Sequence, residues 1–285
     1  IVRSVLTERS VLRVGNGVGS ETRIEGFTFT GGTTGTRSPG GFWVGGGLYL
    51  HNNAAHLVDC VFDGNRSTFG GNLYAMNFDG CLERCVFVGG RADAEGGNAM
   101  FFRGAGKMID CDFIDGKTPG NGGGVKAISG WNRFCGCRFV GNRGDRGGGI
   151  IHVEFNREPS TLHVEESLIA GNRAFEGGGI WGRSTNAGLV LDGTVIRSND
   201  PDGIGGPLNT ALGDRGQECW GDLDGDGMVD GHDIDSLLNR FGPVDETLEF
   251  GWDLDDDGGY DDGSLPTVNV SGAGVDGPSN TSASL

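Results

Sequence analysis

Apolar residues alternate with polar ones in short stretches along residues 20–205, a pattern typical of strands rather than helices. The clearest example is Cys137–Ile150, where a short alternating stretch is followed by a Gly-Asn turn, a polar loop, a glycine run and a second apolar stretch. Related versions begin at Cys60, Cys85 and Cys111, and weaker ones at Phe27, Ser167 and Thr194. The chain therefore contains internal repeats, each with two or more short strands.

One anchor residue in each copy defines the repeat length. The anchors are Phe29, Phe62, Phe87, Phe113, Phe139, Ile169 and Ile196, with spacings of 33, 25, 26, 26, 30 and 27. A period near 26 is too short for a propeller blade, which needs about 40 residues, and a β-sandwich is the other alternative. Short strands repeated at this period predict coils that stack as parallel β-structure about 4.8 Å apart. We expect an all-β fold, a parallel β-helix of about seven coils, over residues 1–210.

Three columns of residues accompany the anchors. Two places before the anchor stand Phe27, Cys60, Cys85, Cys111, Cys137, Ser167 and Thr194, which share the inner face of a strand with the anchors. Five places before it stand Ile24, Leu57, Leu82, Met108, Phe134, Val164 and Leu191, which also face inward if a bend intervenes. Three places after it stand only glycine or asparagine (Gly32, Asn65, Gly90, Gly116, Asn142, Asn172 and Asn199), which predicts a left-handed turn.

The four cysteines of the inward column are Cys60, Cys85, Cys111 and Cys137. Side chains that point in parallel from stacked strands are poorly placed for disulfides. We therefore expect small, apolar-behaving core residues, with a metal or redox site as the alternative. The chain has seven cysteines, so at least one thiol is free or pairs between chains.

The rhythm Phe-x-x-Asn followed by Gly-Gly-x-Ile, with the opening stretch from Ile24 to Gly32, resembles the repeats of polymorphic outer membrane proteins and similar autotransporter passengers. This resemblance to pectin lyase-like proteins covers about residues 20–205. It implies a right-handed β-helix in an extracellular or cell-surface protein.

Charge divides the chain into two unlike parts. Residues 1–210 carry 21 acids and 20 bases, whereas residues 211–285 carry 18 acids and two bases. Neither part is basic enough to predict a nucleic-acid partner. The sequence contains no run of 18 apolar residues, so it predicts no membrane-spanning helix. We expect a linker at 211–218, an acidic module at 219–265 and a disordered tail at 266–285.

The acidic module contains a calcium-binding pattern at residues 222–233. Oxygen ligands at loop positions 1, 3, 5, 7, 9 and 12, with Gly227 at position 6, are those of an EF-hand-type loop. The predicted ligands are Asp222, Asp224, Asp226, the Met228 carbonyl, Asp230 and Asp233. Apolar residues at helical spacing follow, until Gly242 and Pro243 end the helix.

The loop at 222–233 and the helix expected after it resemble a type I dockerin repeat. This resemblance implies Ca²⁺ and a cohesin-like or cell-surface protein partner. Dockerins pair two such repeats, and the second candidate loop is residues 253–264. Its expected ligands are Asp253, Asp255, Asp257, the Gly259 carbonyl and Asp261. Ser264 replaces the last aspartate and Pro266 limits the exit helix, so this site departs from the pattern. An acidic disordered tail is the alternative for the whole module.

Catalytic residues are less clearly indicated. The glycoside hydrolases of this fold carry Asn-Thr-Asp, Asp-Asp, Gly-His-Gly and Arg-Ile-Lys motifs, which residues 1–210 lack. The lyases use calcium-binding carboxylates in neighbouring coils with an Arg or Lys base. Asp59, Arg84 and Asp110 match that arrangement three places before the anchor, and a ladder of solvent-facing ion pairs is the simpler interpretation.

Two further columns suggest binding surfaces. Bases follow the turn at Arg66, Arg91, Lys117, Arg143 and Arg173, where they either track an anionic glycan or form a solvated face balanced by Asp63, Asp93, Asp115 and Asp145. An outward strip after the glycine runs includes Tyr49, Tyr74, Met100, Phe102 and Trp181. This strip is too apolar for an ordinary solvated face. The strip is either covered by another part of the chain or by a partner, or it is a surface on which sugar rings stack.

These observations favour a secreted or surface-attached, calcium-binding β-helix protein that acts as a non-catalytic adhesion or attachment scaffold. The alternative is a carbohydrate-active enzyme, a polysaccharide lyase or glycoside hydrolase, tethered through the dockerin-like module. The two differ in one measurable property, because only the enzyme releases new chain ends from a polysaccharide.

Overall fold

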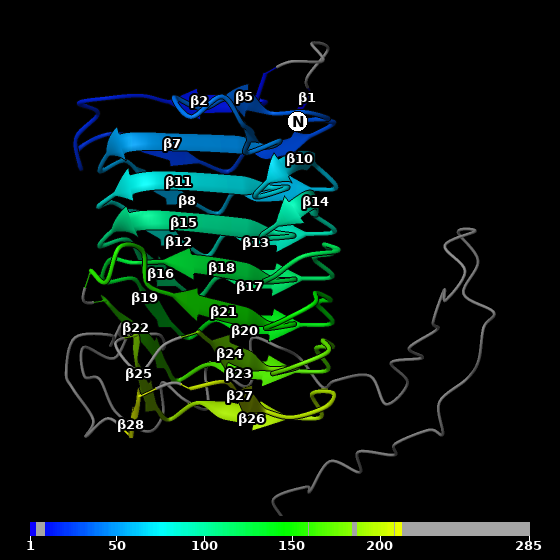
Figure 1. Ribbon diagram of the computed structural model, residues 1–285. Coiled ribbons are helices and arrows are strands. Elements are labelled where there is room, and N and C mark those ends of the chain that lie inside the picture. Colours follow the sequence, from blue (N-terminus) through cyan, green and yellow to red (C-terminus); the bar gives the residue numbers. More distant parts are fainter. Residues whose placement is uncertain (4–8, 159, 184–186, 208, 213–285) are drawn as a thin grey trace, which may run out of the picture. The chain divides into compact units, whose positions relative to one another are not determined.

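The computed structural model describes residues 1–3, 9–158, 160–183, 187–207 and 209–212. In these residues the chain forms 28 strands and no helix. Three sheets of eight parallel strands wind together as a parallel β-solenoid (Figure 1). The seven anchors lie on seven successive strands, so the steps between them make about six turns. The prediction of an all-β, parallel β-helix is confirmed, with about six turns where about seven coils were expected.

The first sheet holds the anchor residues at the centre of three-residue strands. It contains β1 (Val2–Arg3), β4 (Thr28–Thr30), β9 (Val61–Asp63), β13 (Val86–Val88), β17 (Asp112–Ile114), β20 (Arg138–Val140), β23 (Leu168–Ala170) and β26 (Val195–Arg197). Phe29 pairs with Phe62, and every later anchor pairs in the same register. This register is what the repeat spacing predicts.

The second sheet follows the glycine runs. It contains β2 (Leu12–Val14), β7 (Leu48–Asn53), β11 (Leu73–Phe78), β15 (Ala99–Gly104), β18 (Val125–Ile128), β21 (Ile150–Val153), β24 (Ile180–Gly182) and β27 (Ile204–Gly205). The glycine runs are explained by close contact between coils. A Cβ on Gly97 would lie 2.2 Å from the carbonyl oxygen of Gly123 in the next coil, so no larger residue fits.

The third sheet carries the apolar column that lies five places before the anchors. It contains β3 (Arg23–Glu25), β8 (His56–Val58), β12 (Cys81–Glu83), β16 (Lys107–Ile109), β19 (Arg133–Cys135), β22 (Ser160–Glu165), β25 (Ala187–Asp192) and β28 (Asn209–Leu212). A fourth, small sheet adds β5 (Thr36–Arg37), β6 (Trp43–Val44), β10 (Arg66–Phe69) and β14 (Arg91–Glu95). Its β5–β6 pair is antiparallel.

The solenoid interior is built from stacked identical side chains. Phe29, Phe62, Phe87, Phe113 and Phe139 form one column, in which neighbouring ring centroids are 5.0–5.1 Å apart and the rings are nearly parallel. Offset stacking of this kind contributes about 0.5–1.5 kcal/mol per pair beyond the burial of apolar area. The predicted cysteine column is also confirmed, because Cys60, Cys85, Cys111 and Cys137 are buried and free.

Two columns of left-handed residues turn the chain between sheets. The column three before the anchors joins the third sheet to the first, and all seven of its residues have φ between 46° and 72°. The second column lies two places after the anchors, with φ between 53° and 78°. The bend required to keep both apolar columns inside is therefore present.

The prediction of a left-handed turn three places after the anchors is wrong, because none of those residues has positive φ. Asparagine occurs there for its side chain. The amides of Asn65, Asn72, Asn98, Asn142, Asn172 and Asn199 form a continuous hydrogen-bonded ladder, with nitrogen–oxygen distances of 2.9–3.2 Å. Each amide also donates to a backbone carbonyl, such as that of Phe113 for Asn142 (2.8 Å). We call these six residues the asparagine ladder.

Candidate functional site

The lyase-like triad lies in the left-handed column between the third and first sheets. Asp59, Arg84 and Asp110 have φ of 50°, 48° and 51° in three successive coils. Their backbone N–H groups bond to the next coil, as that of Arg84 does to the carbonyl of Ile109 (2.9 Å). The structure thus places the triad in one column, as predicted, and gives each member a role in turning the chain.

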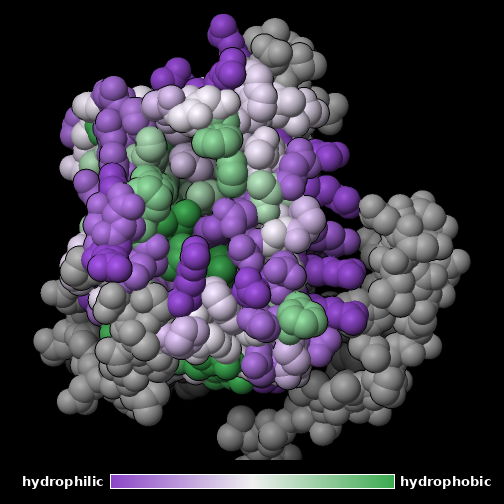
Figure 2. Space-filling model, in the orientation of Figure 1, coloured by the Kyte–Doolittle hydropathy of each residue, from purple (hydrophilic) through white to green (hydrophobic). Residues whose placement is uncertain are grey.

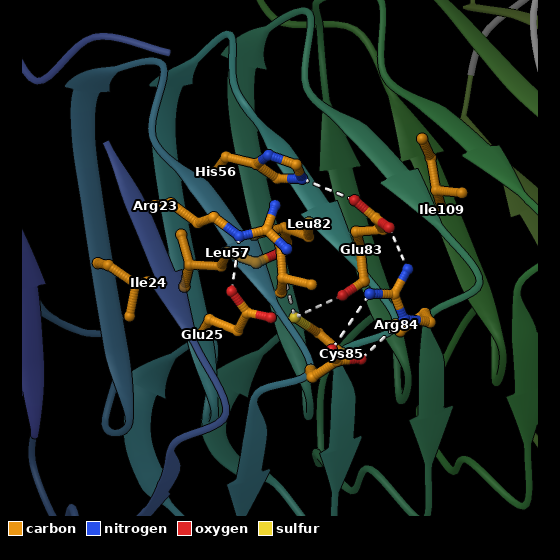
Figure 3. A network of polar contacts seen from close by, with 12 residues as sticks. Arg23, Ile24, Glu25, His56, Leu57, Leu82, Glu83, Arg84, Cys85 and Ile109 are labelled. Carbon is orange, nitrogen blue, oxygen red and sulfur yellow. Dashed lines mark hydrogen bonds and ion pairs between the residues drawn. The ribbon is translucent and has the colours of Figure 1, made fainter. Parts of the chain in front are cut away.

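Arg84 is held by two carboxylates (Figure 3). Its Nε lies 2.8 Å from Asp59 Oδ1 and its Nη2 lies 3.1 Å from Asp59 Oδ2, a bidentate pair. Its Nη1 contacts Glu83, whose other oxygen lies 2.9 Å from Nε2 of His56. Glu83 and His56 were not among the predicted site residues. Their pairing follows from the register of β12 on β8, which sets Cys81 beside His56 and Glu83 two residues further along.

The electrostatics of this pair oppose proton transfer. The hydrogen bond to Asp59 raises the pKa of the Arg84 guanidinium above its already high value. The same bond lowers the pKa of the Asp59 carboxyl. Both groups are therefore charged at neutral pH, and a cation stabilised in this way is a poor general base. Because both side chains are more than a third exposed, the pair contributes about 0–1 kcal/mol to stability.

A second charged feature is the basic column, which we call the basic ladder: Arg66, Arg91, Lys117, Arg143 and Arg173. Parallel pairing joins each member to the next. At the ends of the ladder, Arg66 pairs with Asp93 (2.7 Å) and Arg173 pairs with Asp200 (3.3 Å). The three central bases form no ion pair with any described residue. The structure therefore brings together all five predicted bases.

The outward strip forms a hydrophobic cluster separate from the solenoid core. Its buried members are Val44, Tyr49, Tyr74, Met100, Ile128, Ile151 and Val153, and Phe69, Met76, Phe102 and Trp181 pack against them. Val44 and Phe69 come from the small fourth sheet, so part of the strip is covered by the chain itself. Figure 2 shows apolar residues on the floor of a hollow in this face, with hydrophilic side chains around it.

Arginine side chains lie over two aromatic rings of the strip. The guanidinium of Arg13 lies 5.6 Å from the ring centre of Tyr49, and that of Arg146 lies 5.2 Å from the ring of Trp181. Tyr49 is only 1% exposed, so its ring has little surface for a sugar. The structure therefore favours the covered-strip interpretation for Tyr49, while Phe102 and Trp181 remain partly accessible.

One polar pair interrupts the strip. Lys126 is buried in the outward column between Met100 and Ile151, and its ammonium contacts the carboxylate of Glu95. Burial lowers the pKa of Lys126, and Glu95 partly offsets the effect. The sequence pattern did not reveal the partner Glu95, which lies 31 residues earlier on β14. The two meet because the end of β14 in one coil lies beside β18 in the next.

The described residues contain neither the predicted calcium loops nor another candidate metal site. Among the residues that the structure describes, no group of three or more His, Cys, Asp or Glu side chains is placed to hold a metal ion. The two predicted calcium loops, at 222–233 and 253–264, lie outside the described residues. In the described part of the chain, no helix is long and apolar enough to cross a membrane.

Comparisons with known proteins add no relative. No family model, no curated protein and no solved structure matches the chain. The parallel β-solenoid assignment therefore stands on the strand pairing itself, and function must be argued from the residues described above.

Proposed function

We propose that this protein is an exported, non-catalytic attachment scaffold. The observation that carries the proposal is the use of Arg84: the one arginine placed like a lyase base is held by Asp59 and Glu83 and braces neighbouring coils. The stacked Phe and Asn columns support the same role, because they make a rigid rod whose surface side chains repeat at the strand spacing of about 4.8 Å. A surface of this kind suits a repetitive or extended partner.

The proposal includes a calcium-ordered module at residues 219–265. It is supported by the EF-hand spacing of Asp222 to Asp233 and by the apolar helix pattern that follows. The similarity to dockerins makes a cohesin-like or cell-surface protein the partner of this module, and an extracellular or cell-surface location the setting. The kinship of the solenoid with polymorphic outer membrane protein repeats, and with the pectin lyase-like fold, belongs to this proposal as well.

A carbohydrate-active enzyme is the second candidate. The specific observation in its favour is Lys126, a buried lysine of lowered pKa beside Glu95, on a face that also carries Tyr74 and Trp181. Perturbed titratable groups of this kind are frequent at catalytic sites, although structural ion pairs produce them too. In this hypothesis, the dockerin-like module tethers a polysaccharide lyase or hydrolase.

The deciding experiment is release of new chain ends from a panel of plant and algal polysaccharides, with calcium present. The scaffold proposal expects no release from any substrate, together with retention of the protein on isolated cell envelopes or insoluble polysaccharide. Release from one substrate class overturns it. In that case Lys126→Met and Arg84→Gln variants separate the two candidate sites, because only the variant at the true site loses activity.

A further inference from the structure

The basic ladder has a geometry that an isolated surface charge lacks. Its five members lie at the same position of five successive coils, immediately after the left-handed turn and the anchor strand. Parallel pairing fixes their backbones about 4.8 Å apart. Hydrophilic side chains project in a row from one edge of the face drawn in Figure 2, and β10 and β14, which begin with Arg66 and Arg91, lie along that edge in Figure 1.

The three central members are available for a ligand. Arg91, Lys117 and Arg143 are exposed, and none forms an ion pair with the described residues. Acids do lie nearby. Asp93 is engaged by Arg66, and Asp200 by Arg173.

The two acids closest in sequence to the central bases are Asp115 and Asp145. Asp115 is exposed and forms no ion pair with Lys117 or with another described residue. Asp145 is exposed and forms no ion pair with a described residue. Three aligned cations therefore face solvent within a solenoid whose net charge over residues 1–210 is only −1, from 21 acids and 20 bases.

Row spacing and surroundings indicate the class of ligand. A row of cations at one strand spacing matches a linear polymer that carries one negative group on each short, repeating unit. Nucleic acid is a poorer fit, because single-strand binding sites combine a basic groove with several aromatic rings on which bases stack. Only one strongly exposed aromatic residue lies in the turns that carry the ladder among the described residues: Phe175, which is 76% exposed and follows Arg173 by two positions.

A single ring beside aligned cations suits a sugar polymer. The ring packs on the apolar face of one sugar, and the cations neutralise the carboxylates or sulfates of the others. The geometry points to the basic ladder as a binding site for a linear acidic polysaccharide, aligned with the solenoid axis and held chiefly by Arg91, Lys117 and Arg143. This inference rests on the proposed scaffold function and names the ligand class for it.

The test measures binding of the full chain to polygalacturonate over a series of salt concentrations, with calcium held constant. The variant Arg91→Gln/Lys117→Gln/Arg143→Gln is compared with Lys107→Gln/Arg157→Gln/Arg197→Gln. The control triple removes the same charge from exposed bases outside the ladder. We expect the ladder triple to bind at least tenfold more weakly at low salt. Its slope of log K against log salt should be flatter by about two units, taking roughly 0.7 for each lost contact. The control triple should bind within twofold of wild type.

Two further arms define the ligand. Fully methyl-esterified polymer, which keeps the sugar backbone but lacks charge, should not bind. Phe175→Ala should weaken polygalacturonate binding without changing the salt slope, because the ring contributes no charge.

Several outcomes overturn the inference. Equal weakening by both triples means that only net charge matters, and tighter binding of single-stranded DNA than of polygalacturonate means that the ligand class is wrong. Failure of the wild-type chain to bind at low salt also overturns it, and is the result expected if the chain's own acidic stretch, residues 211–285, occupies the ladder. If the wild-type and ladder-triple proteins are retained equally on cell envelopes, the ladder inference falls while the scaffold proposal stands.

Discussion

The side-chain amide of Asn98 donates a hydrogen bond to the side-chain oxygen of Asn142, 3.2 Å away and 44 residues later in the chain. The two residues occupy different positions of the repeat. Asn142 lies three places after its anchor, whereas Asn98 lies at the end of a glycine run. Where the asparagine comes from the run, the position three places after the next anchor is a glycine, and a Cβ on Gly116 would lie 2.7 Å from the amide nitrogen of Asn98. Two positions, one in each of two successive coils, thus compete for one site.

This competition predicts a rescue. Asn98→Gly should destabilise the protein by about 2–3 kcal/mol, because it removes bonds to the backbone N–H of Gly90 and the carbonyl of Ile114 in the buried interior. The double variant Asn98→Gly/Gly116→Asn should recover most of that loss, since an asparagine at 116 would accept from the backbone N–H of Gly90, as Asn142 accepts from that of Gly116. Urea unfolding measures both free energies. Asn16→Gly, at an exposed turn, is the control, and a double variant no more stable than Asn98→Gly would contradict the two-position model.

The Asp59–Arg84 pair should contribute little to stability. A double-mutant cycle with Asp59→Asn and Arg84→Gln, followed by urea unfolding, should give a coupling energy below about 1 kcal/mol, because both side chains are partly solvated. A coupling of 3 kcal/mol or more would show that the pair is shielded from water. The same variants should leave binding to polysaccharide unchanged, because the pair lies outside the basic ladder.

The buried His152 should make the solenoid sensitive to acid. Burial lowers its pKa to about 4, and its Nδ1 has no hydrogen-bond partner among the described residues. The unfolded chain has the ordinary value near 6.5, so it takes up a proton first as the pH falls. Stability present above pH 6.5 is therefore lost between pH 6.5 and 4, by about 3 kcal/mol at the low end.

The measurement is the free energy of unfolding at pH 7 and pH 4.5 for the wild type and for His152→Gln. Carboxylates also titrate in this range, so the informative quantity is the difference between the two proteins. The variant should lose about 2 kcal/mol less than wild type over this interval. Equal losses would mean that His152 is not the group responsible.

Chelation should unfold the acidic module while leaving the solenoid intact. Without calcium, the fifteen carboxylates in residues 219–265 repel one another at close range. We expect EDTA to remove helical circular dichroism and to leave the β signal unchanged, with Asp222→Asn/Asp224→Asn reproducing the effect in calcium. An unchanged helical signal on adding EDTA argues against the calcium loop.

The fold was predictable because its strongest signal is local and repeated. The anchor column alone sets the register that pairs Phe62 with Phe87. The asparagine column was misinterpreted because asparagine suits both a left-handed turn and an internal amide ladder, and only neighbouring coils distinguish the two. Conversely, Arg84 and Glu166 adopt positive φ against their intrinsic preference, since the apolar residues on either side must both face the core. The Lys126–Glu95 pair depends on contact between β14 and β18, which no periodicity reveals.

The asparagine ladder also allows one coil to be duplicated without changing the solenoid interior. Each amide bonds to the next amide of the ladder and to a nearby backbone carbonyl, so the ladder is built entirely from local bonds. A duplicated segment such as 86–111 would meet the same partners above and below, and would lengthen the rod by one strand spacing, about 4.8 Å. Reach and valency can therefore grow by gene duplication, with no redesign of the interior.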